Sequence, residues 1–590
     1  MQLNWFDAGV FLAFIGFVVA FSMYMSRRGK TSEDYFLASR GLMWPLIGLS
    51  IVAANLSTEQ FVGMAGQGAG DVGLAVSAWQ LTGAVGIVII AFTLLPRFLR
   101  AGIYTMPEYL EYRYNPWARA IMAFYTMIIY ATVTITAVLY SGGLTLSAIF
   151  GLDLTLSIWL IGGIAAVYTT WGGLKAVAWA DLFQGAGLMI GGLVTLYLVL
   201  QASGGVGPFY QENAQQLHMV LPADHPTLPW TGVLLGMWIP IVYYCGLNQF
   251  IVQRTLAAKD LRHGQLGIIF AAGLWLLVPF AIVIPGIAAK KLYRPELAAE
   301  ADKDNAKVLA MFEKVKLSSA GPGNPLVFRM DDSWKGRHPE KVRAIARHNE
   351  IARSTAEKEG LAVDEQNLVG YKYDAAYPIL IRNLIYPGIR GLMFAAIAGA
   401  VISSLASMLN SASTIFTMDL YKRLVAANAP QRRLIVIGRL MTLLFVIVGC
   451  LLAPALGHPR FKGVFNFIQE FQGYVSPGIV AAFLVGFIVK RAPAAAGVVA
   501  LVISAPIYGL LHYFFGTNGA AGVEIHFLLR MTITFAAVTA VMVAIRLVAP
   551  MDEPKTIPVK QDFDATPSPL ALALGAAVIA GVVAFFVVFW

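Results

Sequence analysis

The chain has 590 residues, of which 58% are hydrophobic and 13% charged, and its mean hydropathy is +0.68. Apolar runs of membrane-spanning length recur along it, which excludes a soluble globular domain and indicates a polytopic helical protein of the lipid bilayer. The net charge of +10 does not indicate a nucleic-acid partner, because the basic residues cluster at every second gap between apolar runs, as orientation signals do.

Six helices are predicted in the first third of the chain. The first covers about 8–25, and Arg27 and Arg28 after it place its end in the cytoplasm and the N-terminus outside. Residues 1–43 therefore form this helix and a cytoplasmic linker. The next five helices are predicted at 44–69, 73–95, 118–149, 154–175 and 178–200.

Eight more helices are predicted in the remainder, which is interrupted by a polar insert at 290–377. The insert is rich in charged residues and, by alternation, lies outside the membrane as a small cap or a mobile lid. The helices are predicted at 229–250, 264–289, 388–420, 431–454, 461–489, 493–514, 525–549 and 568–589. The sequence thus predicts an all-α protein of about fourteen transmembrane helices with both termini outside.

The centre of the second predicted helix is unusually polar. Asn55, Ser57, Thr58, Glu59 and Gln60 lie within its apolar run. Polar side chains at mid-membrane are costly unless they face a wet cavity, a partner or a bound ion. They indicate either a polar face packed on other helices or a helix broken at mid-membrane, whose freed backbone groups could bind a cation and a polar solute.

A second polar stretch lies in the helix predicted at 388–420. Ser403, Ser404 and Ser407 follow small residues there, a pattern that is also typical of close helix packing. A hard cation such as sodium prefers a cage of carbonyl and hydroxyl oxygens. The two serine hydroxyls at 403 and 404, beside freed carbonyls of Ala53 and Leu56, would supply such a cage, so the two stretches together favour a sodium site over packing alone.

Seven short segments in this order resemble the sodium:solute symporter family, in its sodium/glucose cotransporter branch, and bacterial sodium/galactose symporters in particular. They cover nearly the whole chain apart from the insert. The segments are 31–36 (TSEDYF), 53–61 (AANLSTEQF), 102–108 (GIYTMPE), 171–176 (WGGLKA), 253–259 (QRTLAAK), 403–410 (SSLASMLN) and 468–470 (IQE).

The resemblance implies a leucine-transporter-type fold with two inverted repeats of five helices, at 44–200 and 229–489, in which the second and seventh helices are broken. The last three helices, at 490–590, lie outside the repeats. It also implies a sodium site made by the carbonyls of Ala53, Leu56 and Ala400 and the hydroxyls of Ser403 and Ser404. Asp181 matches an acidic residue thought to help sodium leave; the alternative is a solvated carboxylate at the membrane interface.

The resemblance places a solute pocket between the broken helices, with differences from the branch. Gln80 replaces a Glu, Gly83 a Ser, Ile241 an Asn and Trp275 a Lys. The implied solute-binding residues are Asn55, Gln60, Gln80, Ile241, Trp275 and Gln469. The implied gates are Tyr244 on the inner side and Met64, Trp79 and Phe465 on the outer side.

These residues predict what the pocket accepts. Neutral amides and flat aromatic faces suit a small uncharged polyhydroxylated solute, whereas an anion would need an Arg or Lys, and none stands at a matching position. We therefore expect sodium-coupled import of a sugar or sugar-like polyol by alternating access across the cytoplasmic membrane, with a monomer sufficient. A nucleoside, an N-acetylated amino sugar or an inositol stays open as the solute. A non-transporting sensor is the less favoured alternative.

An enzyme is not expected. The predicted cytoplasmic segments contain no metal-ligand cluster, nucleophile–base pair or phosphate-binding loop. Cys245 and Cys450 both lie in apolar runs, where we expect reduced packing residues.

Overall fold

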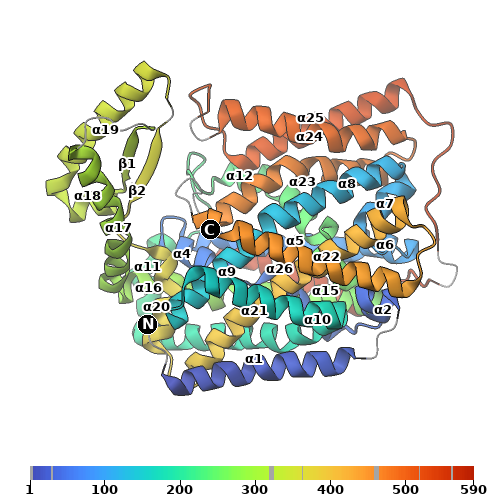
Figure 1. Cartoon of the computed structure of the whole chain (residues 1–590), viewed down its shortest axis with the longest axis horizontal. Coiled ribbons are helices and arrows are strands. Elements are labelled where there is room, and N and C mark those ends of the chain that lie inside the picture. The colour runs from blue at the N-terminus through green and yellow to red at the C-terminus, as the bar shows by residue number, and fades with distance from the viewer. Residues whose placement is uncertain are drawn as a thin grey trace.

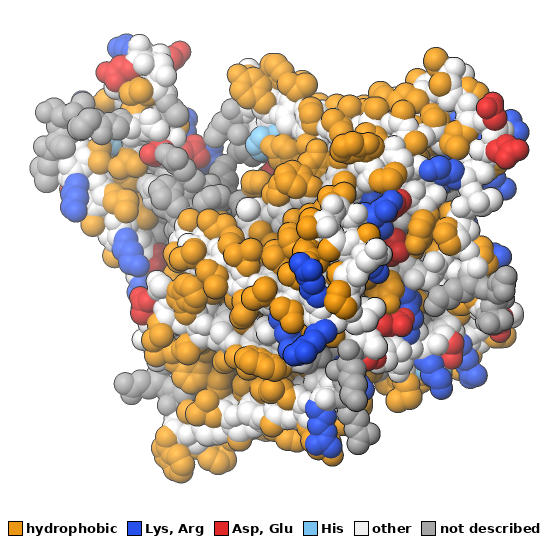
Figure 2. All heavy atoms as spheres, turned by 45° about the vertical axis from the view of Figure 1, so that its right-hand side comes forward, with side chains coloured by type: hydrophobic (Ala, Val, Ile, Leu, Met, Phe, Trp, Pro, Cys, Tyr) orange, Lys and Arg blue, Asp and Glu red, His pale blue; other side chains and the backbone are white. Residues whose placement is uncertain are grey.

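A computed structural model describes residues 4–27, 31–317, 324–361, 363–457, 464–516, 519–559 and 563–590. Long helices run side by side in one bundle, and a small unit with two strands projects from the end at which the N-terminus lies (Figure 1). Hydrophobic side chains cover the flank of the bundle broadly, while Lys and Arg gather toward the end remote from the unit (Figure 2). This surface is typical of a helix bundle surrounded by lipid.

Most elements of the first half fall within the predicted ranges. They are α1 (Trp5–Ser26), α2 (Ser32–Leu37), α3 (Trp44–Asn55), η2 (Glu59–Met64), α4 (Ala65–Ala69), η3 (Gly73–Ser77), α5 (Ala78–Thr93), α6 (Leu95–Ala101), α7 (Met106–Arg113), α8 (Pro116–Ile129), η4 (Tyr130–Thr134), α9 (Ile135–Phe150), α10 (Leu154–Ala202) and α11 (Val206–Asn213).

The elements of the second half are interrupted more often. They are α12 (Trp230–Leu235), α13 (Trp238–Val242), η6 (Tyr243–Leu247), α14 (Gln249–Leu256), α15 (Leu261–Trp275), η7 (Pro279–Val283), α16 (Ile284–Leu292), α17 (Arg294–Leu317), β1 (Leu326–Met330), α18 (Asp332–Arg337), α19 (Pro339–Glu359), β2 (Asp364–Leu368), η8 (Tyr373–Ala375), α20 (Ala376–Leu384), α21 (Ile389–Ile415), η9 (Phe416–Val425), α22 (Gln431–Leu452), α23 (Val464–Ile488), α24 (Ala494–Phe515), α25 (Phe527–Val548) and α26 (Pro569–Val588).

The described residues contain 11 helices long and apolar enough to span a membrane, or 12 if one bent pair is counted. The predicted count of fourteen is therefore not confirmed. One reason is that α10 joins two predicted helices into a single run of 49 residues. The other is that the predicted helix at 229–250 is divided into short helices, none of which is long enough alone.

The two predicted helices inside α10 meet at a sharp turn. Gly173 has φ 57° and ψ −157°, a conformation open to glycine but strained for other residues. A Cβ at this position would lie 2.3 Å from the backbone oxygen of Tyr35. A tight turn therefore separates the helices predicted at 154–175 and 178–200.

Both helices expected to be broken are interrupted. Between α3 and η2, Leu56 has the extended angles φ −81° and ψ 95°, and the two halves are bent by 58°. Between η6 and α14, Asn248 has φ −82° and ψ 121°. The Tyr130 hydroxyl bridges this second break, because it donates to Asn248 Oδ1 and accepts from the Phe250 N–H at 3.1 Å. The broken pair is thus confirmed, while the division into repeats stays a prediction.

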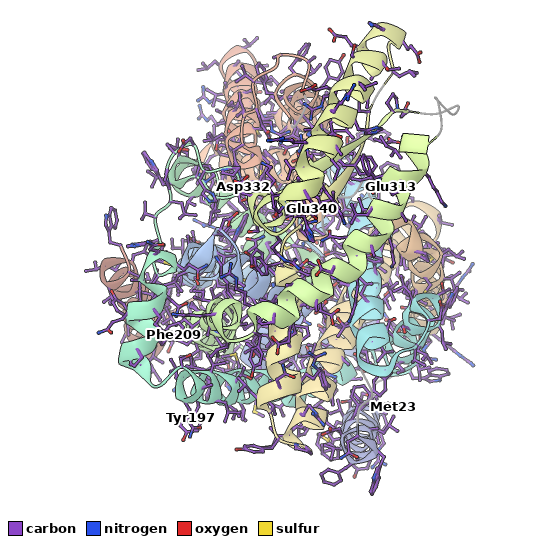
Figure 3. The ribbon with its side chains drawn as sticks, turned by 90° about the vertical axis from the view of Figure 1, so that its left-hand side faces the viewer. Met23, Tyr197, Phe209, Glu313, Asp332 and Glu340 are labelled. Carbon is purple, nitrogen blue, oxygen red and sulfur yellow. The ribbon has the colours of Figure 1, made fainter. Side chains whose placement is uncertain are left out.

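The polar insert is a folded unit with its own core. Its two strands, β1 and β2, pair in parallel beside α17, α18 and α19. The buried core residues are Phe312, Phe328, Trp334, Ile345 and Leu368. Figure 3 shows Glu313, Asp332 and Glu340 on this unit, which stands in front of the end of the bundle. The chain is predominantly helical, as predicted, and β1 and β2 form the one sheet among its described residues.

Both termini lie on the side of the unit. Asp7, at the start of α1, pairs with Arg390 at the start of α21, which follows the insert. The last residues reach the same side, since Phe589 O accepts a hydrogen bond of 2.7 Å from Met219 N in the loop that precedes α12. This agrees with the predicted alternation, and the assignment of this side to the outside stays a prediction.

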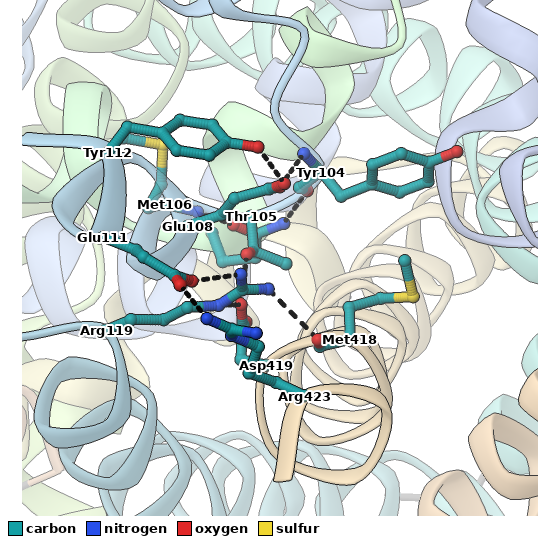
Figure 4. A network of polar contacts seen from close by, with 11 residues as sticks. Tyr104, Thr105, Met106, Glu108, Glu111, Tyr112, Arg119, Met418, Asp419 and Arg423 are labelled. Carbon is teal, nitrogen blue, oxygen red and sulfur yellow. Dashed lines mark hydrogen bonds and ion pairs between the residues drawn. The ribbon is translucent and has the colours of Figure 1, made fainter. Parts of the chain in front are cut away.

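At the opposite end, a network of ion pairs ties α7 to its neighbours (Figure 4). Arg119, at the start of α8, pairs with Glu111 at 2.7 Å and with Asp419 of η9 at 2.7 Å. Arg423 pairs with the same Glu111 at 2.6 Å. Thr105 Oγ1 also donates to Asp419 at 2.7 Å. The network fastens the neighbouring helices α7 and α8 to η9, which lies far away in sequence.

Candidate functional site

A cavity of about 100 Å³ lies between the two helix breaks. It brings together all six predicted solute-binding residues and three of the four predicted gate residues. The side chain of Phe465, the fourth, lies outside the described residues. The predicted residues that line the cavity are Asn55, Gln60, Gln80, Ile241, Trp275, Gln469, Met64, Trp79 and Tyr244.

A chain of hydrogen bonds crosses the cavity wall. Gln80 Nε2 on α5 donates to Asn55 Oδ1 at 3.0 Å, and Asn55 Nδ2 donates to the Tyr244 hydroxyl at 3.2 Å. The first break is thereby joined to α5 on one side and to η6 on the other. The first break is therefore directly bonded to Tyr244, the residue expected to form the inner gate.

Gln60 stabilises the break itself. Its Oε1 accepts a hydrogen bond of 2.9 Å from the Ser57 N–H, one of the backbone donors that the interruption of the helix frees. The amide nitrogen of Gln60 remains available to donate to a solute in the cavity. Gln60 is thus both a structural residue of the break and a lining residue of the cavity.

Three further lining groups have no protein partner. Among the described residues, Gln469 Oε1, Trp275 Nε1 and Thr134 Oγ1 are buried without a hydrogen-bond partner. Buried polar atoms are rarely left so, because an unmade hydrogen bond costs about 1–3 kcal/mol. The cavity therefore offers an amide acceptor, an indole N–H donor and a hydroxyl to a bound molecule.

Sequence reasoning did not include five polar lining residues among the candidate sites. These residues of the cavity wall are Ser57, Glu59, Thr134, Asn248 and Gln472. Glu59 belongs to the polar cluster noted at the first break, so its mid-membrane position was a usable signal. None of the described residues that line the cavity is a Lys or an Arg.

Two residues that differ from the symporter branch, Ile241 and Trp275, pack against glycines of α5. A Cβ on Gly83 would lie 3.3 Å from Cζ3 of Trp275, and a Cβ on Gly86 would lie 2.5 Å from Cγ2 of Ile241. The large side chains at 241 and 275 therefore pack against an α5 face that has no side chains. Since Cζ3 lies on the indole edge away from Nε1, the free N–H points away from Gly83.

The predicted sodium-binding residues meet beside the first break. Ser404 Oγ donates to Ala54 O at 3.0 Å and lies 3.5 Å from Ala53 O, at the end of α3. Ala400, Ser403 and Leu56 are fully buried nearby in the same helices. Oxygens of this kind suit a hard cation, so the residues present fit sodium; the Ala54 carbonyl was not among those expected.

Asp181 is fully buried, so the alternative of a solvated interfacial carboxylate is wrong. It accepts hydrogen bonds from the hydroxyls of Ser403 and Ser50 and pairs with Arg254 Nη2 at 3.1 Å. Arg254 lies beyond the end of the helix predicted at 229–250. The helix α14 continues through it to Leu256, and every residue of α14 is buried.

The chain resembles known proteins over most of its length. The sequence profile of the sodium:solute symporter family matches residues 35–312 and 364–503. A sodium/glucose cotransporter of Vibrio parahaemolyticus is 34% identical over 580 residues, which cover 96% of this chain and 94% of that protein. Sodium/myo-inositol cotransporter 2 of Homo sapiens is 31% identical over 506 residues, which cover 82% of this chain and 66% of that protein.

Two solved structures share the fold. A Na⁺-coupled sialic acid symporter in a substrate-bound outward-open state has a TM-score of 0.71 at 21% identity and covers 94% of this chain and 100% of its own. The nucleobase-cation-symport-1 family transporter MHP1 has a TM-score of 0.50 at 14% identity and covers 93% of this chain and 99% of its own.

Proposed function

Because the chain belongs to the sodium:solute symporter family and is a sodium-coupled symporter rather than an enzyme, we propose that it imports a small, uncharged, polyhydroxylated solute. A sugar or a cyclic polyol such as an inositol is the expected class. We place the protein in the cytoplasmic membrane, with both termini outside, and expect a monomer to suffice.

The character of the cavity carries this proposal. Unpaired groups of Gln469 and Trp275 can accept from and donate to hydroxyls, and the aromatic rings of Trp79 and Tyr244 offer flat apolar surfaces. With Glu59 in the lining and no Lys or Arg among its described residues, an anion would be buried beside a carboxyl without a partner. The named solutes of the relatives above, glucose and myo-inositol, fit this chemistry.

Sodium is the second substrate in this proposal. The oxygens that would hold it are the carbonyls of Ala53, Leu56 and Ala400 and the hydroxyls of Ser403 and Ser404. These oxygens come from the end of α3 and from α21, so sodium would hold the first break against α21. The same break carries Asn55 and Gln60, so sodium and solute binding should favour one another by reciprocity of the two binding events.

The energy of one sodium ion is sufficient for accumulation. Entry down about 100 mV releases roughly 2.3 kcal/mol, and a tenfold concentration gradient adds roughly 1.4 kcal/mol. Together they support a solute gradient on the order of several hundredfold.

Uptake into liposomes tests the proposal. Purified protein would be reconstituted, and labelled D-glucose, D-galactose and myo-inositol offered with an inward sodium gradient or with potassium in its place. We expect at least one of them to accumulate above its external concentration only with sodium. N-Acetylneuraminic acid, an anion, should not compete. Accumulation without sodium, or competition by the anion alone, would contradict the proposal.

A further inference from the structure

A side chain from α24 makes hydrogen bonds to the backbone of α23 in the middle of that helix. The Gly478 N–H donates to Ser504 Oγ at 3.0 Å, and Ser504 Oγ in turn donates to Tyr474 O at 3.1 Å. In a regular helix Gly478 N–H would bond Tyr474 O directly. Pro477 lies at the same place and has no N–H to donate. A proline or an inserted side chain is a known cause of a helix kink. We call the segment Tyr474–Gly478 the joint of α23.

The helix is fixed on the inner side of this joint. Arg113 Nε donates to Gly486 O at 2.7 Å and its Nη2 donates to Val489 O at 2.7 Å. The Tyr114 hydroxyl donates to Ala482 O at 2.8 Å. These three hydrogen bonds fasten the inner part of α23 to the end of α7, independently of the joint.

On the outer side of the joint, residues 468–473 form a short arm with two different faces. Ile468, Gln469 and Gln472 line the cavity. Glu470 is held on another side of the arm: its Oε1 lies 3.0 Å from Arg530 Nη1 and its Oε2 lies 3.1 Å from Arg530 Nη2. This bidentate ion pair fixes the orientation of the Glu470 carboxylate as well as its distance from Arg530.

Side chains of α24 and α25 complete the attachment of Glu470. The Tyr508 hydroxyl donates to its Oε1 at 2.8 Å, and His512 Nδ1 lies 2.9 Å from the same oxygen. The Arg530 side chain is 3% exposed, so its charge has little access to solvent and depends on this carboxylate.

The start of α25 also contacts the opposite wall of the cavity. The ring of Phe527 is stacked on Trp79 of α5, with centroids 6.4 Å apart and planes 5° from parallel. One turn of α25 therefore touches a lining residue of α5 through Phe527 and the arm of α23 through Arg530.

We propose that Glu470 and Arg530 are positioning residues for Gln469: they hold the arm so that the Gln469 amide faces the cavity. The arm turns about the Tyr474–Gly478 joint when the pair is broken. The inference rests on the proposed function for its transport readout, and α25, outside the expected repeats, thereby contributes to solute binding.

Sodium-driven uptake of the best-transported of D-glucose, D-galactose and myo-inositol tests the role of the pair. Glu470→Gln weakens a charge-assisted pair, so the solute KM should rise about tenfold with Vmax nearly unchanged. Combining Glu470→Gln with Gln469→Ala should give the KM of Gln469→Ala alone, because the amide that the ion pair positions is then absent. Arg546→Ala, near the other end of α25, is the matched control and should behave as wild type. Independent, multiplied KM effects in the double variant would overturn the proposal.

A second measurement does not need a transported solute. In a Cys245→Ser, Cys450→Ser background, a cysteine replacing Gln472 on the arm would be labelled with a membrane-impermeant thiol reagent. Arg530→Ala should raise its labelling rate about tenfold, and Arg530→Lys by less, since Lys keeps the charge without the two-pronged geometry. Unchanged labelling in both variants would overturn the positioning role, whereas failure of wild-type uptake alone would count only against the proposed function.

Discussion

Asp181 and Arg254 form an ion pair at 3.1 Å in which both side chains are fully buried. Arg254 also donates to Ser50 Oγ at 2.6 Å and to Ser407 Oγ. The pair therefore connects α10, α14, α3 and α21 at one point. Since Asp181 also accepts from Ser403, the expected sodium-binding serines are directly joined to the helix that follows the second break.

Removing one charge of this pair should be more harmful than removing both. Asp181→Asn leaves the Arg254 guanidinium buried and unpaired, a change that typically costs about 3–5 kcal/mol. Asp181→Asn with Arg254→Gln should recover part of this loss. Thermal unfolding in detergent is measured for Asp181→Asn, Arg254→Gln and the double variant. A double variant as unstable as the two single effects added together would show that the charges do not act as a pair.

The specificity of the cavity should depend on the three unusual residues. The triple change Gln80→Glu, Ile241→Asn and Trp275→Lys should weaken transport of the native solute and shift preference toward galactose or glucose. Trp275→Lys alone should transport less than the triple variant, because its ammonium would lack added polar partners. Competition by a panel of unlabelled sugars is the measurement. Identical inhibition profiles in all variants would show that these positions do not select the solute.

The network at the charged end of the bundle should respond to acid. Burial raises the pKa of the Glu111 carboxyl, but ion pairs and hydrogen bonds with Arg119 and Arg423 outweigh burial, so its pKa lies below the ordinary value. Such a group stabilises the fold fully above its unfolded pKa, and this contribution is lost as pH falls through the lower folded pKa.

Glu111→Gln should therefore remove part of the acid dependence of stability. Between pH 7 and about 5 the unfolding temperature of wild type should be nearly constant, and below the ordinary glutamate pKa of about 4.3 it should fall. The variant should start lower and fall less steeply. Glu340→Gln on the small unit serves as the control and should follow wild type. Parallel curves for wild type and Glu111→Gln would contradict the role of the carboxylate.

The orientation of the chain can be tested on the same unit. A cysteine in place of Glu340, which is exposed, should react with a membrane-impermeant thiol reagent added outside intact cells. A cysteine in place of Arg97, exposed at the opposite end, should react only after the cells are opened. The reverse pattern would invert the predicted topology.

Several features could be predicted because they leave a local mark in the sequence. The polar cluster at 55–60 indicated the first break, and the run Ser403–Ser404 indicated oxygens beside it. Asp181 was recognised, but its partner was not, since Arg254 lies in a basic segment that looks like an ordinary inner loop. Only the fold shows that α14 continues through it in the core.

Other features depend on contacts between distant helices. Nothing near Gly478 shows that Ser504 inserts into α23, and nothing near Gly83 shows that Trp275 packs on it. The parallel strands β1 and β2 are separated by two helices, so neither has a neighbour in sequence. The count of fourteen takes the two halves of α10 as separate spans and the divided segment at 229–250 as one span.

Sodium coupling through Ser404 is tested most directly by the sodium dependence of uptake. Ser404→Ala removes one oxygen from the proposed cage, so the sodium concentration for half-maximal uptake should rise about tenfold. Ser413→Ala is the matched control on the same helix, because Ser413 Oγ donates to Asn410 O of its own helix, and it should match wild type. An unchanged sodium dependence in Ser404→Ala would show that Ser404 is a packing residue and that sodium binds elsewhere.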